Sequence, residues 1–259
     1  MNRDTLRQVL TVLAVLVTIV INILSNALPI NGLNTGQISD QFQVYFTPAG
    51  YVFSIWSLIY LGLIAFAAYQ ALPSQRNNAT LRAIAPLFWL SSAANIAWIF
   101  LWHYQVFGLT LVAMFTLLIS LILIYLRLGI ARGAAGGWQK WCVHLPFSLY
   151  LGWITVATIA NVTIVLWWAG WNGFGISPEV WLAIVLAVAV IIAALVALTR
   201  ADVVYQLVLV WAFVGIAVKH GGVPGVAISA IVAAVLAGLL AILSLLPKGP
   251  LPVGRRAQP

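Results

Sequence analysis

The strongest constraint on this chain is its division into eight apolar stretches, separated by short polar or glycine- and proline-rich segments. A bilayer hydrocarbon core about 30 Å thick is crossed by roughly 20 apolar residues in an α-helix. Because backbone polar groups in lipid must be bonded within the protein, we predict an all-α membrane protein, a polytopic bundle of about eight transmembrane helices. The predicted spans are Val9–Leu28, Tyr51–Leu72, Ala83–Trp102, Phe107–Leu126, Cys142–Trp168, Val180–Leu198, Val203–Val218 and Gly225–Leu246.

Composition excludes the other broad classes of protein. Hydrophobic residues make up 64% of the 259 residues and charged residues only 6%, whereas about a quarter of the residues in soluble domains are charged. A disordered chain needs the opposite balance, with low hydrophobicity and high charge. The single cysteine, Cys142, excludes a disulfide framework and a metal site built from cysteines.

The positions of the basic residues predict the orientation. If the N-terminus is cytoplasmic, only Lys219 among the twelve basic residues falls outside. This bias follows the positive-inside rule and places both termini in the cytoplasm, in a multi-pass protein of the cytoplasmic (inner) membrane. The net charge of +8 therefore indicates topology and contact with the lipid bilayer, and we expect no nucleic-acid partner. The residues on the inner side are Arg3, Arg7, Arg76, Arg82, Arg127, Arg132, Lys140, Arg200, Lys248, Arg255 and Arg256.

Few residues in the spans suit acid–base or metal chemistry. All four acidic residues lie at span ends or in loops, and the three histidines lie near span ends. Ion-coupled transporters carry ionisable groups within the membrane, and no Ser-His-Asp motif is present. We therefore expect no enzyme, no catalytic residue and no metal, although an activity on a bound pigment stays open. Arg200 and Asp202 are predicted to pair at the inner end of their spans.

Three of the predicted helices carry a stripe of aromatic, small and amide side chains. Residues three, four and seven positions apart lie on one face of a helix. The predicted directions of the second, third and fifth spans place Trp56, Trp98 and Asn161 in the outer half of the membrane. The stripes are Phe53, Trp56 and Tyr60; Ser91, Asn95, Trp98 and Trp102; and Pro146, Tyr150, Trp153, Ala157 and Asn161.

The stripes have two interpretations. In the first, Asn95 and Asn161 hydrogen-bond across helices, each bond contributing about 1 kcal/mol, and the aromatic rings only pack. In the second, the stripes line a pocket with aromatic walls and a few fixed polar groups, as lipophilic ligands require. Asn22 and Asn26, one turn apart near the outer end of the first span, could join such a pocket.

Three segments resemble one known family. FTPAGYVFSIWSLIY at 46–60, NIAWIFLW at 95–102 and LPFSLYLGWITVATIAN at 145–161 resemble, in order and spacing, motifs of the tryptophan-rich sensory protein / translocator protein family (TspO/MBR). The resemblance covers roughly residues 8–170. The first motif departs from the family pattern in three ways. Ala49 stands in place of a proline, Tyr51 stands in place of a tryptophan, and one residue is missing between Phe53 and Trp56.

The resemblance implies a five-helix unit over residues 1–170, extended by about three transmembrane helices over 171–246 and a short basic cytoplasmic tail over 247–259. It implies a ligand pocket for porphyrins and other flat lipophilic molecules, and often a homodimer. A lid over the pocket is expected from residues 29–49, with Tyr45, Phe46 and Pro48 near its end. The implied ligand-binding residues are Trp56, Tyr60, Asn95, Trp98, Trp153, Ala157 and Asn161.

The function expected from these features is binding of a planar lipophilic ligand for sensing or transport. No cofactor is expected, and a porphyrin, haem or similar tetrapyrrole is the expected ligand. Two alternatives remain open. All eight helices could form the path of a small-molecule permease, or the chain could be an accessory membrane subunit that has no ligand pocket.

Overall fold

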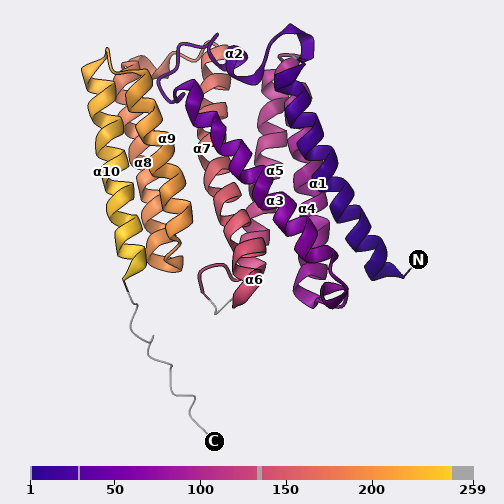
Figure 1. Ribbon diagram of the computed structural model, residues 1–259. Helices are drawn as coiled ribbons and strands as arrows, with labels where there is room; N and C mark the ends of the chain where they lie inside the picture. Colours follow the sequence, from indigo (N-terminus) through magenta and orange to yellow (C-terminus); the bar gives the residue numbers. More distant parts are fainter. Residues whose placement is uncertain (1, 29, 133–135, 247–259) are drawn as a thin grey trace, which may run out of the picture.

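A computed structural model describes residues 2–28, 30–132 and 136–246, and every regular element in these ranges is helical. Eight long apolar helices run up and down in one bundle (Figure 1). They are α1 (Arg3–Ala27), α3 (Ile55–Ala71), α4 (Ala79–His103), α5 (Phe107–Arg127), α7 (Leu145–Trp168), α8 (Pro178–Arg200), α9 (Val203–Lys219) and α10 (Pro224–Leu245). The short helical turns are η1 (Ile30–Gly32), α2 (Thr35–Ser39), η2 (Gly50–Ser54), η3 (Pro73–Gln75), α6 (Gly137–Gln139), η4 (Lys140–His144) and η5 (Gly173–Gly175).

These helices confirm the predicted fold class. In the described part of the chain, seven helical segments are long and apolar enough to cross a membrane, and α9 with 17 residues is shorter. A helix of that length spans about 25 Å. Asp202 and Lys219 lie at its two ends.

The helix ends follow the polar residues of the sequence, with one revision. Ser177 caps α8, accepting a hydrogen bond from the Val180 amide at 3.4 Å. In contrast, α1 begins six residues before its predicted start. The buried Arg7 side chain donates to the carbonyl oxygen of Gln75 at 3.1 Å, and Gln8 Nε2 donates to that of Gln70 at 2.7 Å. These bonds give hydrogen-bond partners to side-chain donors of α1 that are buried inside the bundle.

The bundle has one end rich in basic residues, which we call the basic end. All described lysines and arginines except Lys219 lie there, at the beginning of α1, beside the α3–α4 connection, after α5, before α7 and at the end of α8. The opposite end carries residues 30–54, here called the lid segment (Figure 1). The cytoplasmic orientation of the basic end stays a prediction, and the predicted tail 247–259 lies outside the described residues.

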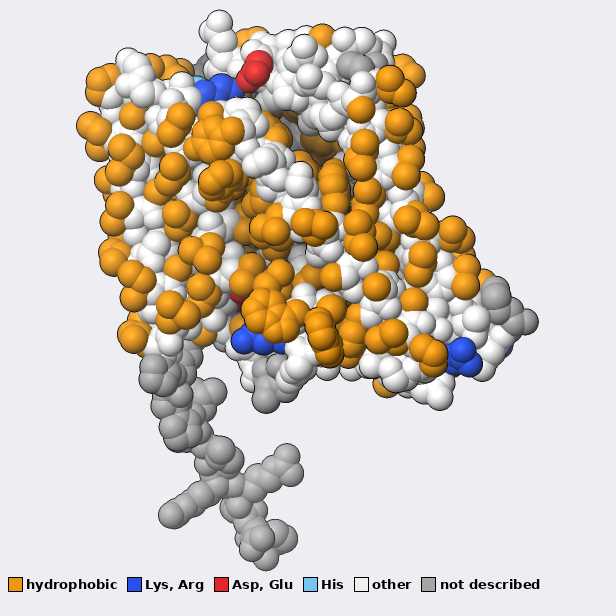
Figure 2. Space-filling view, viewed as in Figure 1, with side chains coloured by type: hydrophobic (Ala, Val, Ile, Leu, Met, Phe, Trp, Pro, Cys, Tyr) orange, Lys and Arg blue, Asp and Glu red, His pale blue; other side chains and the backbone are white. Residues whose placement is uncertain are grey.

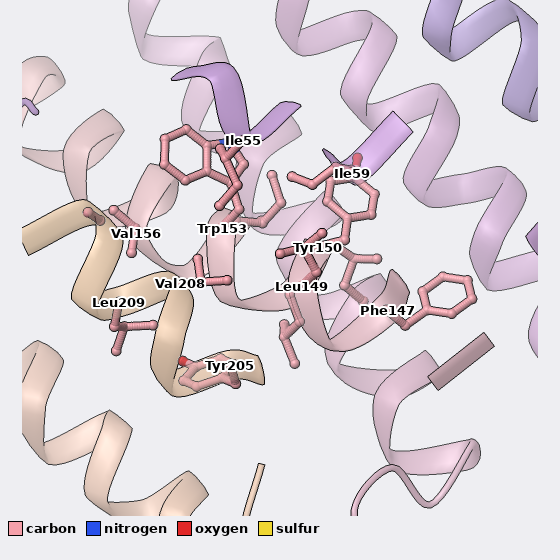
Figure 3. Close-up of a cluster of buried hydrophobic side chains, with 14 of the residues drawn as sticks. Ile55, Ile59, Phe147, Leu149, Tyr150, Trp153, Val156, Tyr205, Val208 and Leu209 are labelled. Carbon is pink, nitrogen blue, oxygen red and sulfur yellow. The ribbon is translucent and has the colours of Figure 1, made fainter. Parts of the chain in front are cut away.

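The three C-terminal helices join the rest of the bundle through α9. This helix packs on α7 (Figure 3). Helix α10 packs on both α8 and α9 (Figure 1). Close approach is possible because a Cβ atom built on Gly152 of α7 would lie only 3.0 Å from Val208 of α9. Val208, Leu209, Ala212 and other α9 residues are buried in the main core. The domain boundary predicted at residue 170 stays a prediction.

A buried carboxyl group connects α9 to the five-helix part at the basic end. Asp202, only 4% exposed, accepts hydrogen bonds from the hydroxyls of Tyr125 at 2.8 Å and Ser148 at 2.6 Å and from the Tyr205 amide at 3.2 Å. Arg200 does not form the ion pair predicted for it, since its guanidinium lies over the Tyr125 ring, 5.7 Å from the centroid. Asp202 is therefore held by neutral donors from three helices.

Candidate functional site

A cavity of about 730 Å³ lies between the lid segment and the five N-terminal long helices. On the face shown in Figure 2 the surface is hollowed between α1 and α3, near the lid end. The cavity has an apolar side built from α3, α4, α5 and α7 and a polar side built from α1 and the lid segment. It is lined by Asn22, Ile23, Asn26, Ala27, Asn34, Thr35, Gly36, Gln37, Asp40, Gly50, Phe53, Trp56, Ser57, Tyr60, Asn95, Trp98, Ile99, Met114, Leu117, Trp153, Ile154 and Ala157.

Aromatic rings form the walls of this cavity. Trp56 and Tyr60 stack with centroids 5.6 Å apart and planes 25° apart, and Trp153 meets Trp56 edge-on at 6.2 Å. On another wall Trp98 stacks on Trp102 at 5.1 Å and 18°. Stacked and edge-to-face rings at these separations stabilise one another by about 1 kcal/mol per pair beyond their buried area. The rings are therefore held in fixed orientations around the cavity.

Six of the seven predicted site residues line this cavity, and the seventh lies next to it. Asn161 lines a smaller space of about 60 Å³. Five residues border both spaces: Thr35, Phe53, Trp98, Trp153 and Ala157. The spacing on α7 carries Asn161 one turn beyond Ala157, toward α5 and away from the large cavity. The structure thus brings the predicted residues together without placing all of them in one space.

The Asn95 amide is occupied by neighbouring side chains. Its Oδ1 accepts from Asn22 Nδ2 at 2.7 Å and its Nδ2 donates to the Tyr150 hydroxyl at 3.1 Å. Asn22 also donates to the Thr18 carbonyl oxygen at 2.8 Å. These bonds connect α1, α4 and α7 along the cavity wall, as the interhelical interpretation of Asn95 required.

Asn161 acts on the cavity through Trp98. The Trp98 Nε1 donates to Asn161 Oδ1 at 2.9 Å, and Asn161 Nδ2 donates to the Thr110 hydroxyl at 2.9 Å. An indole ring has a single N–H donor. Because that donor is bonded to the side-chain amide of Asn161, α7 sets the orientation of the Trp98 ring. Asn161 is therefore a positioning residue for a wall of the cavity.

Two residues that line the cavity have a buried side-chain polar atom without a partner in the described part of the structure, Thr35 Oγ1 and Trp153 Nε1. Trp153 is 3% exposed, and its Nε1 is enclosed without a hydrogen-bond acceptor. Figure 3 shows Trp153 on α7 close to Ile55 of α3. A buried unpaired donor costs about 1–3 kcal/mol, so an acceptor atom of a bound molecule would relieve that cost.

The polar side of the cavity comes from residues that the stripes did not predict. Asn34 and Gln37 cap α2 reciprocally, each side chain accepting from the other's backbone amide at 2.9 Å. Asn26, which the sequence suggested as an addition, also lines the cavity. Asp40 is the one charged side chain among the described lining residues. The N-x-x-Q spacing of residues 34–37 is typical of the start of a helix, but it does not indicate that this helix lies over a cavity.

Part of the predicted lid, residues 29–49, borders the cavity. These residues are Asn34, Thr35, Gly36, Gln37 and Asp40, and Gly50 follows them. Tyr45 turns toward the C-terminal helices, and Pro48 borders only the smaller space. The Tyr45 hydroxyl donates to Glu179 Oε1 at 3.1 Å, and this bond to a carboxylate raises the pKa of the Tyr45 hydroxyl. The Tyr45 ring meets His220 edge-on at 5.2 Å, and burial lowers the pKa of the His220 imidazole.

Metal-binding groups are not gathered here. The described residues contain no cluster of three or more His, Cys, Asp or Glu side chains that could hold a metal ion.

Comparison with protein families matches residues 8–244 to one family, described as TSPO-like protein. The chain belongs to the TSPO-like protein family. No curated protein and no solved structure matches it.

For this TSPO-like membrane protein, the match confirms the resemblance indicated by the three motif segments. It also extends that resemblance, because the matched region continues beyond residue 170 through α8 and α9 and into α10. The C-terminal helices therefore lie within the region of the chain that matches the family.

Proposed function

We propose that this TSPO-like protein binds a planar lipophilic molecule, such as a porphyrin or a related tetrapyrrole, in the large cavity. The observation that carries the proposal is the arrangement of stacked rings around a space that opens between α1 and α3. The cavity volume of about 730 Å³ lies within the range of roughly 300–1,000 Å³ that is usual for small-molecule pockets.

The aromatic walls supply the main attraction for such a ligand. A flat ring system entering from the hollowed side would contact Trp56 and Tyr60 on one wall and Trp98 on another. Burial of its apolar surface contributes about 25 cal/mol per Å² removed from water. Trp153 Nε1 offers the unpaired donor for an acceptor atom of the ligand.

The roles of the two asparagines differ from those that the resemblance implied. Asn95 and Asn161 each use a donor and an acceptor on neighbouring side chains. We assign them to positioning Tyr150 and Trp98, respectively. Direct polar contacts to the ligand are assigned to Asn26, Gln37 and Trp153.

The charge of the cavity favours a ligand without exposed carboxylates. Asp40 is the single charged group among the described lining residues, and it is an acid. Protoporphyrin IX carries two carboxylates, which its dimethyl ester lacks. We therefore expect the ester to bind at least as tightly as the free acid.

Quenching of tryptophan fluorescence in detergent, titrated with protoporphyrin IX, its dimethyl ester and haem, tests the proposal. Saturable quenching should weaken at least about tenfold in Trp98→Ala and in Trp153→Ala. Trp138→Ala is the matched control, because Trp138 is 75% exposed at the basic end. Unchanged affinity in both cavity variants would refute the assignment of the pocket.

We infer that this binding serves sensing or transport, and flux distinguishes the two. Proteoliposomes that accumulate a porphyrin in a protein-dependent manner would favour transport. Saturable binding without flux would favour sensing. A stable co-purifying partner together with the absence of saturable binding would favour the accessory-subunit alternative.

A further inference from the structure

The C-terminal helices hold the lid segment through its backbone. The Ala49 amide donates to the Gly215 carbonyl oxygen of α9 at 3.1 Å, and Trp211 Nε1 donates to the Val52 carbonyl oxygen at 3.0 Å. The Tyr51 ring meets Trp211 edge-on at 5.3 Å. The first part of the lid segment is bonded to α4, through Asn31 and Thr35, and backbone hydrogen bonds of residues 49–52 are completed by α9.

A second set of contacts lies at the C-terminal end of α9. Lys219 Nζ pairs with Asp40 Oδ1 at 2.7 Å and donates to the Thr47 hydroxyl at 3.2 Å. His220 Nε2 lies 3.3 Å from the Thr47 carbonyl oxygen. Among the described residues, Lys219 is the only lysine or arginine at this end of the bundle. Lys219, the one described basic residue away from the basic end, therefore has an acidic partner on the lid segment, Asp40.

The fit between α9 and the lid segment depends on a glycine. A Cβ atom added to Gly215 would overlap the Val52 side chain and lie 3.1 Å from Pro48. Val52 is fully buried and β-branched, so it has little freedom to move aside. The lid segment consequently approaches α9 as closely as the backbone allows.

The same segment borders the cavity. Asp40, which pairs with Lys219, lines it, as do Gly50 and Phe53 on either side of Val52. Movement of the lid segment away from α9 would therefore change the opening above the aromatic walls. Tyr45 adds a contact with α8 through Glu179.

From these contacts we propose that α9, with Glu179 of α8, acts as a clamp, which fixes the lid segment over the cavity and limits entry from the aqueous side. Gly215, Trp211 and Lys219 are positioning residues in this clamp. The inference concerns access to the cavity and does not depend on which ligand, if any, occupies it. The C-terminal helices thus have a role at the cavity without lining it.

The clamp is tested by the rate at which a cysteine inside the cavity reacts with a reagent that cannot cross lipid. Ala157→Cys, placed in a Cys142→Ser background, puts one thiol on the cavity wall. A positively charged methanethiosulfonate is applied to the reconstituted protein on the lid side, and the reaction rate is measured without any ligand. Failure of porphyrin binding would leave this readout unaffected.

Two variants release the lid by different means. Gly215→Ala should raise the reaction rate about tenfold, since overpacking must displace Val52 and Pro48. Lys219→Met removes an exposed ion pair and should raise the rate about threefold. This second variant changes only a surface group, so it keeps the test valid if Gly215→Ala lowers the yield of folded protein.

Matched controls separate release of the lid from general loosening. Gly238→Ala places the same methyl group on α10 where nothing lies within 4 Å. Arg82→Met removes the other described ion pair, with Asp4 at 2.8 Å, at the basic end. Both controls should react like the parent protein. Equal rates in all four variants, or equal acceleration in the controls, would overturn the proposal.

Discussion

Replacement of Asp202 is expected to weaken the attachment of α9 to the five-helix part of the bundle. In Asp202→Ala the hydroxyls of Tyr125 and Ser148 and the amide of Tyr205 lose their shared acceptor in a buried place. Leaving one buried polar group unsatisfied costs about 1–3 kcal/mol. Because both hydroxyls can rotate toward other acceptors, we expect a loss of about 3–5 kcal/mol in the free energy of unfolding.

The assay follows thermal unfolding in detergent with a fluorogenic thiol reagent that reports exposure of Cys142, the single cysteine of the chain. For a chain of this size, 1 kcal/mol corresponds to about 2–4 °C, so Asp202→Ala should lower the Tm by about 10 °C. Asp202→Asn retains one acceptor oxygen and should lower the Tm by about half as much.

Asp40→Asn provides the matched control. Asp40 also pairs through one carboxylate oxygen, but its side chain is 65% exposed, and such pairs contribute about 0.2–1 kcal/mol. Its Tm should fall by no more than about 3 °C. Equal shifts for Asp202→Ala and Asp40→Asn would refute the account of Asp202 as the buried connection between the two parts.

Two further predictions concern the cavity. Asn161→Ala removes the acceptor that fixes Trp98 and should weaken porphyrin binding about fivefold, or by ~1 kcal/mol, in the fluorescence titration; unchanged affinity would show that Trp98 is oriented without it. Burial lowers the pKa of the His220 imidazole while the lid segment is in place. On acidification the released imidazole, with an ordinary pKa near 6.5, therefore binds a proton before the clamped imidazole does. Attachment of the lid is therefore fully present above about pH 6.5 and weakens as pH falls below it. The rate of cavity-thiol modification should rise between pH 7 and pH 5, relative to His220→Gln, and parallel pH profiles would contradict this.

The long helices could be predicted from the sequence because apolar length and charge bias determine them locally. The spacing on 150–161 also brought Trp153 and Ala157 to one face, and both border the cavity. The same spacing failed for Asn161, since one further turn faces Thr110 of α5. Periodicity predicts which residues share a face of a helix. It does not predict where along that face a neighbouring helix packs and ends the cavity.

The sequence did not indicate which residues hold the lid segment in place. Its conformation depends on bonds to residues far along the chain, such as Ala49 to Gly215 and Asp40 to Lys219. No local pattern around residues 30–54 indicates those partners. Lys219 carried a signal, as the single basic residue outside the predicted inner side, but charge bias alone did not name Asp40. Arg200 is a similar case. Its predicted partner was Asp202, which is close in sequence, but its guanidinium lies over the ring of Tyr125 on α5.

Occlusion of the cavity shows whether the space between the aromatic walls is a ligand site. Ala157→Phe fills it from the α7 side while leaving the Asn95 and Asn161 hydrogen bonds in place, and Ala93→Phe adds the same ring on the exposed face of α4. The measurement is the Kd for protoporphyrin IX dimethyl ester by fluorescence quenching. The account predicts at least tenfold weaker binding for Ala157→Phe, about 1.4 kcal/mol, and parental affinity for Ala93→Phe. Equal affinity in the two variants would contradict it.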